Sequence, residues 1–466
     1  MESGGSSLAA ILALVRAGAL TRLDIERKSE LGRAAVADRL AVLERLGLVE
    51  EGDLGPPQGG RAPRHFRLRA NAGAVLVAQV DRMSLAVGLA DLAGALIVEH
   101  HEAADLALGP EPILDRLTAL FHWLLDERGG KDAAWAIAVA LPEAALVDAN
   151  DGDTFGIATL DVLRAWRSFD FAAELSLRFG APAFARGNTQ MMTLGEMKAG
   201  AGLGVEDLVC VRIDRSVSAG VVSGGRLHAG AHGLAGLFGH APTGEAGDIP
   251  CHCGAKGCLD AVASAEAVER AALIAAIDGR SGRLAEALAG HGEVTANDVS
   301  HGAQLGDAFC AELLSRSGRL IGESLAPIVN LMNPAVVVLA GPLAHSGEIL
   351  LAAVREAIYR RSHPLATRDL RIVRSQLAGS AELVGAASHA AGQVFASAAG
   401  WVGLGSPRGD PALLALLAEA KTRRRRSAAS PPLGKLAQEA AARPPAGRGL
   451  VSSRRGMPNR KCRETR

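Results

Sequence analysis

The sequence predicts an α/β protein in three parts: a winged helix-turn-helix, a two-lobed α/β body and a disordered basic tail. Three observations predict this fold class. Apolar residues recur at helical spacing over residues 6–46, they alternate as in strands in two units after residue 72, and they become scarce after residue 405. The predicted domains therefore span residues 1–71, 72–400 and 405–466.

The first two helices are predicted within residues 8–28. Leu8, Ile11, Leu12 and Val15 lie on one face of a helix that ends near Gly18. Thr21 can cap a second helix, because its hydroxyl oxygen can accept a hydrogen bond from an unpaired backbone N–H.

A third helix is predicted over residues 33–46, with an apolar inner stripe. Its outward-facing residues are Arg33, Ala34, Ala37, Asp38 and Arg39. We expect this helix to enter a DNA major groove, where its N-terminal residues reach base edges and guanidinium groups pair with guanine or phosphate.

Residues 55–68 predict a hairpin wing. Its tip carries Arg61, Arg64 and Arg67, with no acidic partner expected nearby. The alternative is a solvated charged loop on a small helical domain. A net charge of about +2 over residues 1–71 does not decide between the two.

The body is predicted from two strand-rich units, each followed by helices. In the first unit, strands are expected at Val75–Val80, Leu85–Leu89, Leu96–Val98 and Trp135–Leu141, with a helix at Ile113–Leu125. In the second, strands are expected at Leu208–Ile213, Ala219–Val222 and Val336–Leu339, with long helices over 263–331. Two such units favour two lobes with a cleft between them.

The stretch His240–Asp260, HAPTGEAGDIPCHCGAKGCLD, predicts a structural zinc site. It holds His240, Cys251, Cys253 and Cys258, three of the six cysteines among them. Thiolate sulfur and imidazole nitrogen are ligands of tetrahedral zinc. Buried thiols would need an apolar setting, and a disulfide would need an oxidising compartment. We rank His252 below His240 as the nitrogen ligand, because its side chain lies between two ligands.

Gly239-His240 followed by CxCGxxGCL at Cys251–Leu259 resembles the zinc signature of the ROK family, bacterial sugar kinases and sugar-responsive repressors. The resemblance covers about residues 6–400 and implies a duplicated actin-like ATPase core. The order LTRxDI, outward-facing helix, GLVEE and GGRxP is also similar to the DNA-binding domain of ROK repressors. Gly32 stands where family members usually carry a serine.

The same resemblance implies that the kinase chemistry is lost. Asp81-Arg82-Met83-Ser84 stands where family kinases carry a glycine-rich phosphate loop, and Asp214–Gly220 replaces their second phosphate turn. Asn188 matches the catalytic aspartate, and an amide cannot accept the proton at neutral pH. We expect no enzymatic activity; the alternative is a ROK-type ATP-dependent sugar kinase with an appended DNA-binding domain.

The family's sugar contacts correspond to Gly187 and Asn188, Leu237, His240 and Asp260. Asn188, His240 and Asp260 can still hydrogen-bond a polar effector, but Leu237 cannot. The expectation is a sugar or sugar-like effector, or none. Asp260 can also cap the helix that follows it.

The tail is strongly basic although the whole chain is neutral. Residues 421–466 hold fourteen Lys and Arg against two Glu, a net charge of +12. This arm either adds salt-sensitive DNA affinity or has no role. Without an apolar run of about eighteen residues or a signal pattern, a cytoplasmic, nucleoid-associated bacterial protein without membrane contact is expected.

These features together lead to one expected function. The resemblance implies a regulator of carbohydrate-related genes, expected to be a repressor, that binds a double-stranded operator as a homodimer or higher homo-oligomer. Its partners would be DNA and a sugar-type effector, and its cofactor structural Zn²⁺.

Overall fold

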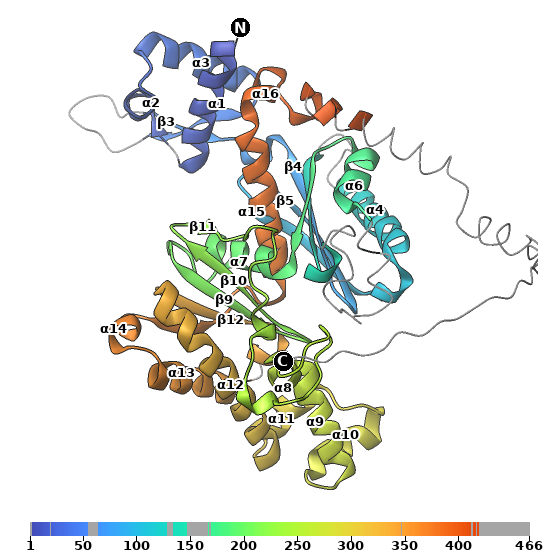
Figure 1. Ribbon diagram of the computed structural model, residues 1–466. Helices are drawn as coiled ribbons and strands as arrows, with labels where there is room; N and C mark the ends of the chain where they lie inside the picture. The colour runs from blue at the N-terminus through green and yellow to red at the C-terminus, as the bar shows by residue number, and fades with distance from the viewer. Residues whose placement is uncertain are drawn as a thin grey trace, which may run out of the picture. The chain divides into compact units, whose positions relative to one another are not determined.

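The computed structural model describes residues 2–18, 20–54, 64–127, 134–146, 166, 169–345, 347–411, 413–415 and 417–418. These residues form a helical head, two sheet-centred lobes and a short C-terminal helical segment (Figure 1). Within the described ranges, no helix is both long and apolar enough to cross a lipid bilayer.

The head contains three helices and a small antiparallel sheet. Its elements are α1 (Glu2–Ala17), β1 (Leu20–Thr21), α2 (Arg22–Ser29), α3 (Arg33–Arg45), β2 (Val49–Leu54) and β3 (Arg64–Leu68). The strands are ordered β1-β3-β2, as in a winged helix. Predicted inner residues of all three helices, including Ile11, Ile25 and Leu40, are fully buried in one apolar cluster.

The helix starts follow from local chemistry. Thr21 caps α2: its Oγ1 accepts a hydrogen bond from the Asp24 backbone N–H at 3.2 Å, and Asp24 Oδ2 accepts one from the Thr21 N–H at 3.1 Å. Helix α3 begins after Gly32, which supplies no side-chain hydrogen bond. Both starts agree with the sequence prediction.

The first lobe is built on a five-stranded sheet with the order β6-β5-β4-β7-β8. The strands are β4 (Ala74–Val80), β5 (Ser84–Ala90), β6 (Leu96–Ala103), β7 (Ala134–Leu141) and β8 (Ala183–Gly187). The pairs β4/β5 and β5/β6 are antiparallel, whereas β4/β7 and β7/β8 are parallel. Its helices are α4 (Pro110–Asp126), α6 (Phe171–Phe179), α7 (Asn188–Ala199) and α15 (Ala381–Ala396).

The second lobe repeats this plan with the strand order β11-β10-β9-β12-β13. Its strands are β9 (Leu208–Ile213), β10 (Val217–Ser223), β11 (Arg226–Leu227), β12 (Val336–Ala340) and β13 (Arg371–Arg374). Two antiparallel pairs are again followed by two parallel pairs, with β9 in the place of β4. The two strand-rich units expected from the sequence are therefore structural repeats.

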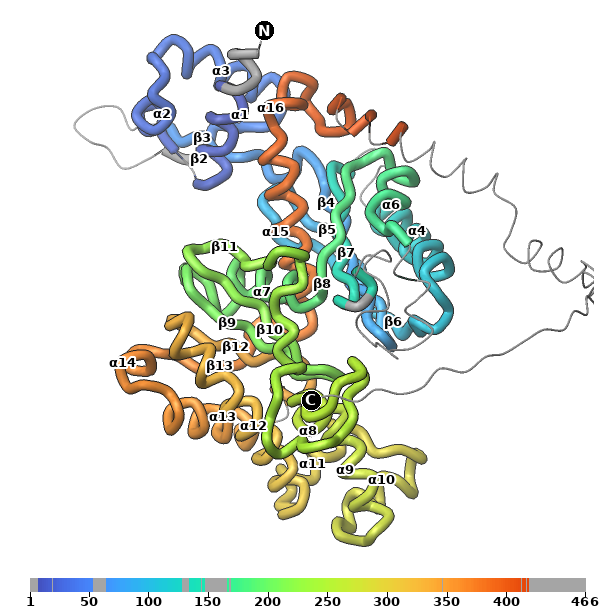
Figure 2. The backbone as a smooth tube through the Cα atoms, viewed as in Figure 1, coloured from blue at the N-terminus to red at the C-terminus, as the bar shows by residue number. Residues whose placement is uncertain are grey.

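Helices fill the second lobe between β10 and β13 (Figure 2). They are α8 (Asp260–Ala263), α9 (Ala265–Ile277), α10 (Gly282–His291), α11 (Ala296–Gln304), α12 (Ala308–Met332), α13 (Glu348–Arg361) and α14 (Pro364–Thr367). Side chains of Ser281, Thr295 and Asp307 cap α10, α11 and α12, which divides the helical region at these points.

The first sheet separates two apolar clusters. Leu76 and Val80 of β4 pack on the side of α4 and α6, whereas Val75 and Val77 pack on the side of α15. This alternation follows from the two-residue repeat of a strand. The cluster on the α15 side is continuous with the core of the head.

The C-terminal segment corrects one predicted boundary. The sequence places the disordered tail from residue 405, but α16 (Ala398–Trp401) is followed by packed residues as far as Leu413, which is 6% exposed. Arg408 donates a hydrogen bond to the Phe179 carbonyl oxygen at 2.9 Å. The rest of the predicted tail, residues 419–466, lies outside the described residues.

Candidate functional site

The loop at residues 240–258, which carries the predicted zinc ligands, lies between β11 and α8 and is held by backbone hydrogen bonds. The bridges Pro242–Cys258 and Pro250–Lys256 draw its two halves together. Gly254 and Gly257 have φ angles of 88° and 82°, a left-handed conformation that favours glycine. The sequence folds this way because these glycines permit the turns that aim the cysteine side chains inward.

His240, Cys251, Cys253 and Cys258 bring their ligand atoms together. All four atoms lie within 4.8 Å of one another. Cys251 Sγ is 3.6 Å from His240 Nδ1, and Cys253 Sγ is 3.7 Å from Cys258 Sγ. Zinc–ligand bonds of about 2.3 Å to sulfur and 2.0–2.1 Å to nitrogen give separations of about 3.6 Å and 3.8 Å at tetrahedral angles. The predicted set therefore fits zinc.

Burial keeps the thiols of the loop protonated when no metal is bound, so a metal ion would have to displace their protons, whereas burial favours the neutral form of His240. Burial raises the pKa of Cys251 to about 12 and raises that of Cys258. Burial lowers the pKa of His240, which favours the neutral imidazole that ligates metals. The sulfur separation between Cys253 and Cys258 far exceeds the roughly 2.05 Å of a disulfide.

His252 and Asp260 border the same site. With His240 and Cys251 they form a second group whose ligand atoms lie within 4.8 Å of one another. The His252 Nδ1 atom is 3.9 Å from Cys251 Sγ and 3.3 Å from Asp260 Oδ2. His252 is exposed, so it fits better as a contact between the loop and Asp260 than as a buried ligand.

Asp260 is held at the first turn of α8. Its Oδ1 accepts a hydrogen bond from the Val217 backbone N–H at 2.6 Å. Burial raises the pKa of Asp260 to about 7. The sequence also allowed Asp260 to cap the helix that follows it. In the structure Asp260 is the first residue of α8, and its carboxylate accepts a hydrogen bond from β10 instead. The side chain that caps α9 is Ser264.

Asn188 begins α7 and is fully buried. Its Nδ2 donates to the Val80 carbonyl oxygen at 3.0 Å, while its Oδ1 has no hydrogen-bond partner among the described residues. The next residue, Thr189, links the lobes: its Oγ1 is 2.6 Å from Ser218 Oγ. A chain of neighbouring residues and hydrogen bonds therefore runs from Asn188 through Thr189 and Ser218 to Val217, whose N–H binds Asp260. His240 lies directly beside Asp260.

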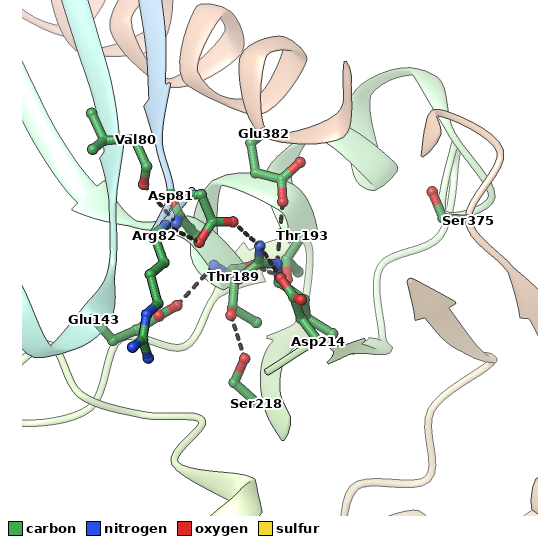
Figure 3. Close-up of polar contacts among 12 residues, drawn as sticks. Val80, Asp81, Arg82, Glu143, Thr189, Thr193, Asp214, Ser218, Ser375 and Glu382 are labelled. Carbon is green, nitrogen blue, oxygen red and sulfur yellow. Dashed lines mark hydrogen bonds and ion pairs between the residues drawn. The ribbon is translucent and has the colours of Figure 1, made fainter. Parts of the chain in front are cut away.

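The two turns expected to have lost phosphate binding meet at Arg212. Asp81 follows β4 and Asp214 follows β9, and both carboxylates pair with the Arg212 guanidinium, Asp214 at 2.7 Å. Glu382 of α15 lies 3.5 Å from Arg212 Nε. Figure 3 shows Asp81, Asp214 and Glu382 pointing toward one another from three separate elements.

Burial alone would lower the pKa of Arg212, but its carboxylate neighbours raise it above the usual value. Burial raises the pKa of Glu382 to about 7, against the opposing effect of Arg212. We call Asp81, Arg212, Asp214 and Glu382 the interlobe charge cluster. Sequence reasoning missed Arg212 and Glu382, because only the fold brings β9 and α15 together.

Glu143 is a further residue that sequence reasoning missed. Its Oε1 accepts a hydrogen bond from the Thr189 backbone N–H at 2.8 Å (Figure 3). Since Gly187 offers no side-chain cap, this carboxylate caps α7 from another segment. A Cβ atom at Gly187 would lie 3.0 Å from Glu143 Cγ, so the glycine permits the approach.

The predicted DNA-contacting residues differ in availability. Arg33 and Ala34 are exposed at the start of α3, and Ala37 is half-buried. Arg39 is also half-buried and its Nε donates to Ser7 Oγ of α1 at 2.9 Å, so its side chain packs within the head. Arg61 lies outside the described residues.

The expectation of a wing without acidic partners was wrong. Arg64 pairs with Glu51, and Arg67 Nε lies 2.8 Å from Glu50 Oε1. The antiparallel register places Glu50 directly opposite Arg67. The described base of the wing is therefore charge-balanced, because two strands of opposite charge are paired.

Comparisons with known proteins agree with this architecture. The model of the ROK family matches residues 85–393. The DNA-binding transcriptional dual regulator NagC of Escherichia coli K12 is 27% identical over 362 residues, 77% of this chain and 86% of NagC. A Thermotoga maritima glucokinase is 31% identical over 224 residues, 48% of this chain and 70% of the enzyme. The crystal structure of a ROK family transcriptional regulator, a homologue of the E. coli MLC protein, superposes with a TM-score of 0.68 at 24% identity, covering 90% of this chain and all of the other.

Proposed function

This chain belongs to the ROK family, and we propose that it is a DNA-binding transcriptional regulator, a repressor of carbohydrate-related genes. The observation that carries this proposal is the head. Helix α3 leaves Arg33 and Ala34 exposed at its N-terminus, next to a three-stranded sheet. Winged heads of this kind bind duplex DNA with this end of the helix in the major groove. The resemblance to NagC along 86% of that regulator supports the same function.

The interlobe charge cluster argues against a sugar kinase. A phosphoryl group needs backbone amides, glycines and cations around it. The two turns instead present the carboxylates of Asp81 and Asp214, and Arg212 already pairs with both. The kinase alternative therefore requires a nucleotide phosphate to displace two carboxylates from their shared cation.

We further infer that the loop at residues 240–258 holds structural zinc through His240, Cys251, Cys253 and Cys258. The separations of 3.6 Å and 3.7 Å between ligand atoms support this assignment. When bound, zinc would hold the loop in one conformation. His240, next to Asp260, would then keep a fixed orientation toward a ligand.

The effector is a sugar or sugar derivative held by Asn188, His240 and Asp260. Asn188 Oδ1 finds no hydrogen-bond donor in the described part of the chain, which supports a ligand that donates a hydrogen bond there. Leu237, which stands where family members carry a glutamate, is 45% exposed. A hydroxyl at that position would find no acceptor from Leu237, so the effector differs from the usual hexose.

Helix α15 provides a physical route from this region to the head. Glu382 on its first turn joins the interlobe charge cluster, and a Cβ atom at Gly385 would lie 1.7 Å from the Met191 carbonyl oxygen of α7. At the other end, the Arg16 guanidinium of α1 stacks over Phe395, 4.7 Å from the ring centroid. A ligand that shifts α7 would therefore move α15 and the head, and in a homodimer change the spacing of two heads.

Selection of genomic DNA fragments by the purified full-length chain tests the function. We expect discrete enriched sites near sugar-uptake or catabolic genes, and a loss of enrichment for Arg33→Ala. Base contacts by arginine contribute about 1–3 kcal/mol, which corresponds to roughly 5–150-fold in affinity. Arg368→Ala, an exposed arginine in the second lobe, is the matched control. An absence of enriched fragments for the unaltered chain would contradict the proposal.

A further inference from the structure

The start of α7 carries an unsatisfied hydrogen-bond acceptor. Asn188 is 0% exposed, and its Oδ1 has no donor among the described residues. Its Nδ2 is fixed by the Val80 carbonyl oxygen at 3.0 Å, which sets the orientation of the amide. A buried carbonyl without a donor is destabilising, so this atom indicates a ligand that donates a hydrogen bond.

A second acceptor, the carboxylate of Glu143, lies beside the next residue of α7, Thr189. Glu143 uses Oε1 to accept the Thr189 N–H, and among the described residues its Oε2 has no hydrogen-bond partner. Thr189 continues the contact to Ser218 of the other lobe. Asn188 Oδ1 and Glu143 Oε2 therefore flank the same helix start, and an ionised carboxylate offers only acceptors.

The charges around this point have an excess of negative sign. The carboxylates of Asp81, Asp214, Glu382 and Glu143 all act on Arg212. Arg82 adds a second cation, and Figure 3 shows its side chain extending on the same side as Glu143. Four carboxyl groups thus face two guanidinium groups, and Arg212 is already paired with three of the four. With Glu382 protonated, three carboxylates still outnumber the two cations.

Electrostatics then selects the class of ligand. A phosphate or carboxylate placed here would add negative charge to a half-buried acidic region. A neutral sugar would satisfy Asn188 Oδ1 but leave the charge excess unchanged. An ammonium group would satisfy acceptors and charge together, because a charge-assisted hydrogen bond is about twice as strong as a neutral one.

We propose that the start of α7 binds the ammonium group of a small hydroxylated molecule, an amino sugar, with Glu143 as the residue that selects it. Asn188 Oδ1 accepts a hydrogen bond from the ammonium group or a neighbouring hydroxyl, and Glu143 Oε2 accepts one from the ammonium group. This proposal rests on the effector site described above. It adds Glu143 to that site and defines the charge of the ligand.

Calorimetric titration of the full-length, zinc-loaded chain with three probes tests the ligand class. The probes are glucosamine, glucose and glucose 6-phosphate at neutral pH, with magnesium chloride alone as a cation probe. We expect glucosamine to bind about tenfold more tightly than glucose, the gain of one charge-assisted hydrogen bond. We expect no binding of glucose 6-phosphate and no effect of magnesium.

Glu143→Gln separates selection from folding, because glutamine keeps an acceptor for the Thr189 N–H, removes the charge and replaces the Oε2 acceptor with an amide donor. The variant is expected to bind glucosamine no more tightly than glucose, with zinc content and thermal stability unchanged. Glu293→Gln, an exposed carboxylate in the second lobe, is the matched control and should leave the tenfold preference intact.

Three outcomes would overturn the proposal: tighter binding of glucose 6-phosphate than of glucosamine, an unchanged preference in Glu143→Gln, or a magnesium effect that Glu143→Gln abolishes. Absence of binding by all probes would also overturn it. If genomic fragments are still enriched in that case, the DNA-binding function stands alone. If glucosamine is preferred but no genomic fragments are enriched, the proposed ligand class stands and the proposed DNA-binding function is contradicted.

Discussion

The loop at residues 240–258 and the interlobe charge cluster occupy neighbouring parts of the body but differ in what they have kept. The loop presents His240 and three cysteines at separations that suit a tetrahedral ion. The cluster places the guanidinium of Arg212 among carboxylates at the two turns that the resemblance matches to the phosphate turns of family kinases. The loop presents a full set of ligand atoms for an added ion, whereas the cluster already pairs its guanidinium with three carboxyl groups of its own.

This difference shows which demands act on each region. A structural metal stabilises the fold, so its ligands are needed whatever the protein does. Phosphate-binding turns serve only phosphoryl transfer, and they can acquire other charges once that reaction is absent. A sensor needs the loop and the connection between the lobes, and here Arg212 supplies part of that connection.

The largest effect is expected from removal of a metal ligand. Cys251→Ser should lower bound zinc from about one ion per chain to none and reduce the melting temperature strongly, because structural zinc contributes up to about 10–16 kcal/mol in small zinc domains. Metal analysis and thermal unfolding measure both quantities.

Cys210→Ser, a buried cysteine in β9, is the control for loss of a thiol alone. It should keep the zinc content. His252→Ala should also keep zinc, whereas His240→Ala should lose it. Equal zinc content in Cys251→Ser and the unaltered chain would contradict the assignment of a zinc site to the loop.

The next effect is expected at Arg212. Arg212→Met leaves Asp81, Asp214 and Glu382 without their shared cation, which should destabilise the folded chain by about 3–5 kcal/mol. Thermal unfolding at neutral pH checks this value. Arg215→Met, at a 43% exposed arginine on the same turn, should cost no more than about 1 kcal/mol. Similar losses in both variants would contradict a buried cluster.

A smaller, pH-dependent effect is expected at Glu382. Its pKa of about 7 in the folded chain lies above the usual value of about 4.3 in an unfolded chain. The folded chain therefore retains a proton that the unfolded chain releases. The stability from this proton is complete below about pH 4 and is lost as the pH rises through 7.

Glu382→Gln should remove this dependence, so the unaltered chain should lose stability relative to the variant between pH 5 and pH 7, by about 3 kcal/mol at most. Melting temperatures across that range measure the difference. Glu348→Gln, at a 67% exposed carboxylate, serves as the control. Parallel curves for the unaltered chain and Glu382→Gln would contradict the raised pKa.

The smallest effect is expected at the hydrogen bond between the lobes. Thr189→Val removes the contact of 2.6 Å with Ser218 and should cost about 1 kcal/mol. Its zinc content should not change, since the loop does not depend on this bond. A large loss of zinc in this variant would show that the two regions are coupled more tightly than their contacts indicate.

The sequence predicted the parts whose signals are local. All four proposed zinc ligands lie within one stretch, and the α3 start, the Thr21 cap and the main strands follow from neighbouring residues. The positions of short or small-residue elements were missed, among them β8, β13 and α15. Alanine and glycine in α15 give little periodicity, although Gly385 allows its close contact with α7.

The interlobe charge cluster could not be predicted because its residues come from three separate segments. Asp81, Arg212 and Glu382 are joined only by the pairing of strands and the packing of α15. The acidic partners of the wing were within reach, since Glu50 and Glu51 lie in the first strand of the hairpin whose second strand carries Arg64 and Arg67. Cross-strand register would have suggested these pairs.

The claim that this chain does not phosphorylate sugars is tested most directly by a coupled assay of ADP release from the zinc-loaded, full-length chain. The chain is incubated with ATP, magnesium and a panel of hexoses, amino sugars included. We predict ADP release that does not exceed the sugar-free background for any sugar, because Asp81 and Asp214 repel the phosphates and Asn188 cannot accept the proton. Sugar-dependent ADP release that is lost in Asn188→Leu would contradict this account.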